Sequence, residues 1–106
     1  MEHQFRRLAN GVFTRMLFVT SDRSGWGIEV RDVVLAPKAA WRGATFPGAT
    51  LFELLGGDGS VREHARDVLS SRTLAGAVSA QTPVDVVNAG DQPFIMRIFV
   101  AQARVR

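Results

Sequence analysis

The chain has no cysteine and no tyrosine, and its 106 residues include only two histidines. Without cysteine it can form no disulfide, no thiolate nucleophile and no cysteine-based zinc site. The same scarcity leaves few side chains for acid–base or metal chemistry. What remains is an ordinary globular composition, 46% hydrophobic and 22% charged, which predicts one folded domain over residues 1–106.

Lysine is scarce too, because Lys38 is the one lysine among 13 basic residues and the others are arginines. The formal net charge is only +3, yet the isoelectric point is near 11.0. With no cysteine or tyrosine to titrate between about pH 8 and 12, a small basic excess moves the isoelectric point far upward. Apart from the adjacent Arg6 and Arg7 the arginines are scattered, whereas phosphate binding needs a stripe of one sign. The charge pattern therefore does not favour a nucleic-acid partner.

Long hydrophobic runs are also missing. The apolar stretch over residues 13–19 is interrupted by Thr14 and Arg15. A membrane span needs roughly eighteen apolar residues, and a signal peptide needs a basic start before an unbroken apolar core. We expect a cytoplasmic protein without a membrane partner.

Short β-branched and aromatic runs, separated by Gly, Pro, Asp and Ser, dominate the chain and predict strands. In one of them Ile28 and Val30 alternate with Glu29 and Arg31, which is typical of a half-buried strand. The predicted strands are residues 11–20, 26–36, 50–55, 60–64 or 60–65, 78–81, 84–88 and 94–105. Roughly seven or eight strands at this spacing indicate an all-β sandwich or barrel.

The segments between these strands receive looser assignments. Residues 1–10 are predicted to be an N-terminal arm, residues 37–49 a loop, and residues 66–75 a loop with a short strand. Gly56-Gly57-Asp58-Gly59 is the strongest turn signal and predicts a hairpin between residues 50–55 and 60–64.

The last predicted strand is apolar on both faces. Met96, Ile98 and Val100 alternate with a second apolar set, which shares its face with Arg97. A strand covered on both sides often means a partner subunit in a small β protein. We therefore expect a homodimer.

Two segments resemble the cupin superfamily. LFELLGGDGSVREH is similar to the middle of a small cupin, and TPVDVVNAGDQPFIMRIFV resembles the family's second motif, TPHxxxNxGDEPxxLxxxV. The match covers residues 26–101, with the turn Asn88-Ala89-Gly90-Asp91-Gln92-Pro93 as its most specific part. The resemblance implies a cupin-like jelly-roll β-sandwich or barrel.

The resemblance also implies that the family's metal site is lost. Aligning the final glycine of the first motif with Gly57 puts the motif's glutamate position on Thr50 and its histidine positions on Ala44 and Phe46. The family's other spacing would move the histidine positions to Gly43 and Thr45. The histidine of the second motif falls on Val84. Hydrocarbon offers no lone pair and a hydroxyl is a weak ligand, so we expect no metal and no cofactor.

The function that follows is a non-enzymatic or accessory protein that binds a small molecule. The former ligand positions, Ala44, Phe46, Thr50 and Val84, would line the pocket and favour an apolar or weakly polar ligand. The alternative is a small cupin-type enzyme (a lyase, isomerase or dioxygenase) with a divergent site. No catalytic residue is assigned, because metal-free cupin-like epimerases pair a histidine base with a tyrosine acid and this chain has no tyrosine.

Two polar side chains remain as candidates for the pocket, His64 and Arg97. Histidine is the usual proton carrier near neutral pH, but alternation puts His64 beside Arg62, on a surface or an edge. Arg97 lies among apolar residues, where an unpaired guanidinium would be costly, so we expect it to pair with an acid. Glu53 is expected to face outward, opposite Phe52.

Overall fold

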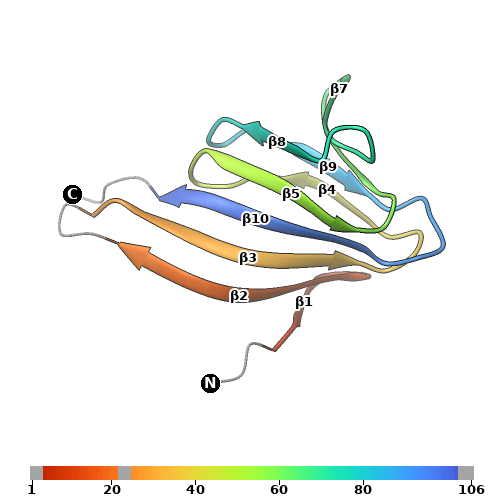
Figure 1. Cartoon of the computed structure of the whole chain (residues 1–106), viewed down its shortest axis with the longest axis horizontal. Helices are drawn as coiled ribbons and strands as arrows, with labels where there is room; N and C mark the ends of the chain where they lie inside the picture. The colour runs from red at the N-terminus through yellow and green to blue at the C-terminus, as the bar shows by residue number, and fades with distance from the viewer. Residues whose placement is uncertain (1–3, 22–24, 103–106) are drawn as a thin grey trace.

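The computed structural model describes residues 4–21 and 25–102, and this part of the chain forms two antiparallel sheets (Figure 1). The six-stranded sheet has the order β1 (Arg6–Ala9), β2 (Val12–Ser21), β3 (Gly27–Leu35), β10 (Phe94–Gln102), β5 (Thr50–Gly56), β8 (Ala75–Val78). The four-stranded sheet has the order β4 (Ala40–Ala44), β9 (Val84–Val87), β6 (Ser60–Glu63), β7 (Arg66–Leu69). The predicted all-β sandwich is confirmed.

The two sheets do not close into a barrel. Within residues 4–21 and 25–102, every strand pairing joins strands of the same sheet, so the fold is a sandwich with an open side. The same residues contain no helix long and apolar enough to cross a membrane.

Alternation along the strands builds the core between the sheets. Met96 and Ile98 of β10 are 0% exposed, whereas Arg97 and Phe99 between and beyond them face the other side of the sheet. Phe52 of β5 points inward and Glu53 outward, as predicted. The side chains of β10 therefore alternate between the two faces of the sheet. The prediction that the last strand has apolar residues on both faces is confirmed.

The predicted hairpin at residues 56–59 is wrong. β5 pairs with β10 and β8, while β6 pairs with β9 and β7 in the other sheet. Phe52 and Val61 enter the same core from opposite sheets, so the turn carries the chain across the sandwich. Gly57 has a φ of +86° and Gly59 packs against the ring of Phe94, where a Cβ would overlap it.

Other boundaries also differ from the predictions. The arm at residues 1–10 contains the edge strand β1, and the loop at residues 37–49 contains β4. β8 begins at residue 75, before the predicted 78–81, and β7 supplies the short strand expected in residues 66–75. Residues 103–105 of the predicted last strand lie outside the described residues. β1 and β4 lack β-branched residues, which is why strand propensity did not indicate them.

Asn88 holds together three segments at one end of the sandwich. It is fully buried, and its side-chain NH₂ lies 3.1, 3.2 and 2.8 Å from the carbonyl oxygens of Leu35, Ala36 and Gln92. Its Oδ1 accepts a hydrogen bond from the Gly90 N–H at 3.1 Å. The end of β3 and the turn before β10 are therefore tied through one amide.

We expect Asn88→Ala to lower the free energy of unfolding by about 2–3 kcal/mol, because it leaves several buried backbone groups without partners. Asn88→Asp keeps the acceptor for Gly90 but loses the donors, so it should destabilise at least as much as Asn88→Ala. Chemical denaturation measures both, with Gln92→Ala as the control, since the side chain of Gln92 is exposed and only its backbone is used. If Asn88→Asp is as stable as the wild type, the amide donors do not matter.

Candidate functional site

The four positions aligned with the cupin metal ligands lie in the interior. Ala44 on β4 is opposite Val84 on β9, and both belong to the buried core with Phe46. Thr50 is 1% exposed, and its hydroxyl donates to the carbonyl of Gly48 at 2.9 Å. The structure thus places all four positions inside the fold.

Aromatic packing fills the space around Phe46. Its ring meets Trp41 edge-on with centroids 5.9 Å apart, and meets Phe52 edge-on at 5.7 Å. Such T-shaped pairs are favourable beyond the area that they bury. Trp41 is partly buried and packs against the core, whereas Trp26 is 54% exposed.

The residues at these positions do not fit a cupin metal. Two aliphatic side chains, one phenyl ring and one hydroxyl present no imidazole or carboxylate. Across residues 4–21 and 25–102, no group of three His, Cys, Asp or Glu side chains gathers closely enough to hold a metal ion. No reaction step through a metal follows from this donor set.

A charged pair occupies the inner face of β3 instead. Arg31 lies opposite Ile98, and Glu29 lies opposite Val100, so both charged residues face the core side of the sheet. Their side chains form an ion pair and are only 20% and 15% exposed. The Nε of Arg31 is buried and has no hydrogen-bond partner.

The inner face of β3 is the one that carries Glu29 and Arg31, and Ile28 and Val30 lie on the outer face. Alternation alone suggested that Ile28 and Val30 point inward, away from the charges. The missed signal is that Arg31 is in phase with Val33 and Leu35, both 0% exposed. The apolar run at the end of β3 therefore decides which face is inside.

The interior opens beside this pair. On either side of a β-bulge in β2, Met16 pairs with Arg31 and Val19 with Glu29, so these two residues also face inward. They are nevertheless 37% and 52% exposed. Figure 1 shows β2 beyond β10 and β5, on the side of the sheet away from β4 and β9. Arg31 thus lies where the closed core gives way to an accessible inner surface.

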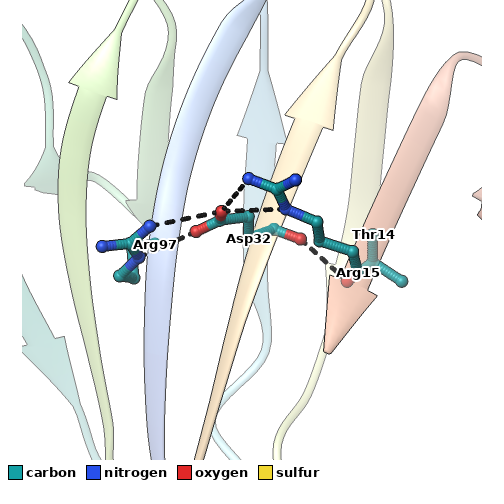
Figure 2. A network of polar contacts seen from close by, with 4 residues as sticks. All are labelled: Thr14, Arg15, Asp32 and Arg97. Carbon is teal, nitrogen blue, oxygen red and sulfur yellow. Dashed lines mark hydrogen bonds and ion pairs between the residues drawn. The ribbon is translucent and has the colours of Figure 1, made fainter. Parts of the chain in front are cut away.

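The outer face of the same sheet carries a second polar cluster, drawn in Figure 2. The carboxylate of Asp32, 3% exposed, lies between Arg15 and Arg97. Arg97 Nε donates to Oδ1 at 2.8 Å, and Arg15 donates to Oδ2 from Nε and Nη2 at 3.3 and 3.2 Å. From the inner side of the sheet, where it pairs with Val33, Thr14 donates its hydroxyl hydrogen to the main-chain oxygen of Asp32 at 2.9 Å. Two cations therefore compensate one buried anion.

This cluster accounts for Arg97. The hydrogen bond that Arg97 donates to Asp32 raises the already high pKa of Arg97. Desolvation opposes this effect, and the negative charges of Asp32 and Glu53 add to it. A base with a raised pKa loses its contribution to stability only as the pH rises through that pKa, so Arg97 stays charged at any pH at which the protein is handled. The expected pairing with an acid is confirmed, and it occurs on the outer face.

His64 lies away from both clusters. It is exposed, between β6 and β7, with a positive φ of 54°. The structure therefore brings neither His64 nor Arg97 to the inner face of the sheet, where Glu29 lies in one cross-strand row with Val100 and Thr50.

Solved structures show which fold this is. An RmlC-like cupin from Shewanella frigidimarina NCIMB 400 aligns with a TM-score of 0.72 and 13% identity, over 97% of this chain and 86% of its own. The polyketide cyclase RemF from Streptomyces resistomycificus aligns with a TM-score of 0.74 and 12% identity, over 99% and 78%. The Cupin_2 domain of an XRE family transcriptional regulator from Enterobacter cloacae gives 0.69 and 11%, over 90% and 99%. No family model and no curated protein matches the sequence. The chain has the cupin jelly-roll fold, as its motifs predicted.

We expect Asp32→Asn to lower the free energy of unfolding by about 2–4 kcal/mol, because it leaves two guanidinium groups side by side without their counter-charge. Asp67→Asn is the matched control, since its partner Arg62 is exposed and the pair at 3.1 Å is solvated; it should change stability by less than about 0.5 kcal/mol. Urea denaturation compares the two without adding salt. Equal effects would show that burial of the Asp32 cluster is unimportant.

Proposed function

We propose that this protein acts in the cytoplasm, that it binds an apolar or weakly polar small molecule at the open side of its two sheets, and that it catalyses no reaction. The proposal depends on one observation about Arg31. Its Nε is buried without a partner, although another nitrogen of the same guanidinium pairs with Glu29, and a buried polar atom of this kind needs an acceptor. Ligand sites are usually apolar surfaces with a few such groups.

The chemistry of the ligand follows from these surroundings. Leaving a buried donor unsatisfied costs about 1–3 kcal/mol, so an oxygen acceptor placed on Arg31 Nε would recover that free energy. Met16 and Val19 offer apolar contact beside it and are partly exposed. The ligand should therefore have an apolar body and a carbonyl or carboxylate oxygen at one end.

Octanoate is a suitable probe, with octylammonium as the probe of equal chain length that has no acceptor. We expect octanoate, and not octylammonium, to shift the backbone NMR signals of Arg31 and Val100 in a saturable titration. The double variant Glu29→Gln with Arg31→Gln removes the guanidinium without leaving an unpaired charge. It should weaken octanoate binding at least about tenfold, in line with the loss of one charge-assisted hydrogen bond.

Glu53→Gln on the outer face serves as the control and should bind octanoate like the wild type. Shifts confined to outer-face residues, or equal binding by the double variant, would contradict the proposal.

An enzyme is the second candidate, because RemF, a polyketide cyclase, aligns over 99% of this chain. A cupin enzyme of the usual kind needs a metal ion, and the chain offers it Ala44, Phe46, Thr50 and Val84. We expect the purified protein to contain less than about 0.1 mole of Fe, Mn, Ni or Zn per mole, since none of these side chains is a good ligand. Elemental mass spectrometry checks this, and a chelator should leave the melting temperature unchanged. Stoichiometric metal that EDTA removes with loss of stability would favour the enzyme.

A further inference from the structure

The outer face of the six-stranded sheet is apolar over most of its width. One row of residues in cross-strand register contains Phe18, Val30, Phe99, Leu51 and Ala77. Phe18 is 53% exposed and Leu51 43%. A second row contains Phe13, Val34 and Ile95. Contiguous exposed apolar surface of this kind marks an interaction site, whereas scattered apolar residues do not.

A row of charges separates the two apolar rows. Register places Arg15 opposite Asp32, Asp32 opposite Arg97, and Arg97 opposite Glu53, on four adjacent strands. From β2 to β5 the signs therefore alternate, plus, minus, plus, minus. If the same row is laid down in the opposite strand order, from β5 to β2, each position carries the opposite charge.

We propose that this face binds a second copy of the chain, packed with its strands in reversed order, so that the charge rows neutralise each other. Arg15 then faces the partner's Glu53, whereas Asp32, whose side chain is 3% exposed, stays paired with Arg15 and Arg97 of its own copy. A two-fold dimer uses the same patch on both copies, and this patch is complementary to itself only in the reversed order. Packing in the same order would place like charges together, at a cost of several kcal/mol.

The area of the face suits a dimer. A nine-residue strand such as β10 is about 30 Å long and four neighbouring strands are about 20 Å wide, so the flat area is about 600 Å². Side-chain relief raises the accessible area toward the roughly 800 Å² that each partner contributes to a standard interface. Two sheets can stack face to face in this way at the spacing that sandwiches use.

A hollow on this face gives the second copy an anchoring point. Its volume is about 310 Å³, and its lining includes Ile28, Leu51, Ala77, Phe99 and Ala101. When the partner's strands run in reversed order, the partner's Phe18 on β2 lies over Leu51 on β5. An exposed aromatic ring entering an apolar hollow is the usual form of an interface hot spot.

Two charge reversals test the arrangement. In Glu53→Arg the partner's Arg15 would meet an arginine, and in Arg15→Glu the partner's Glu53 would meet a glutamate. We expect each variant alone to raise the dimer dissociation constant at least about tenfold, as measured by sedimentation equilibrium. An equimolar mixture should instead form a heterodimer with near wild-type affinity, because both cross-copy contacts become attractive. Native mass spectrometry resolves the heterodimer from the two homodimers.

Circular dichroism establishes that each variant is folded before its association is measured. Asp58→Arg is the matched control: it makes the same change of charge at an exposed loop position outside the row and should leave the dissociation constant unchanged. A wild-type protein that is monomeric at about 100 μM, above the range of specific association, would overturn the proposal. So would a mixture that shows no preference for the heterodimer.

The apolar anchor gives an independent measurement that does not alter charge. Phe18→Ser should raise the dissociation constant at least about tenfold, as expected for a hot-spot aromatic. Leu74→Ser is the control, because Leu74 is 62% exposed and lies outside both apolar rows. Dissociation constants that are equal for the two variants would overturn the placement of Phe18 in the hollow.

Discussion

The constraint on which this structure depends is that the middle of the six-stranded sheet, where β3 and β10 pair, has buried residues on both of its faces. Ile98 is 0% exposed on the inner face, and Val30 and Asp32 are 3% and 2% exposed on the outer one. The four-stranded sheet covers only the inner face. A carboxylate can be buried on the other face only if cations accompany it, which is the role of Arg15 and Arg97.

In the interior, the positions aligned with the cupin ligands hold mostly apolar side chains instead of charged groups with counter-ions. Where the cupin motif would put nitrogen and oxygen ligands, this chain has Ala44, Phe46 and Val84, and they pack into one continuous core. Close packing of hydrocarbon supports such a sandwich without a metal. On the inner face, Arg31 and Glu29 of β3 form an ion pair at the margin of that core, where the inner surface of β2 is accessible.

Alternation and turn residues were sufficient to predict the sandwich, the two faces of β10 and the pairing of Arg97, because these depend on neighbouring residues. They were insufficient for the turn at residues 56–59, since a glycine turn looks the same whether the chain returns beside β5 or crosses to the other sheet. They also missed Arg31. Its face is decided by Val33 and Leu35 further along the strand, and by which side the second sheet covers, which is a long-range property.

The order of residues in β3 makes its register unusually well defined. Arg31 and Asp32 are neighbours in sequence and point to opposite faces, each with a partner that exists only on its own face. A slip of one residue would move the Asp32 carboxylate into the core beside Ile98 and separate it from both arginines. Burying that charge without a partner would cost several kcal/mol, more than the free energy of most single contacts. The charged residues of a largely apolar strand therefore specify which apolar face is inside.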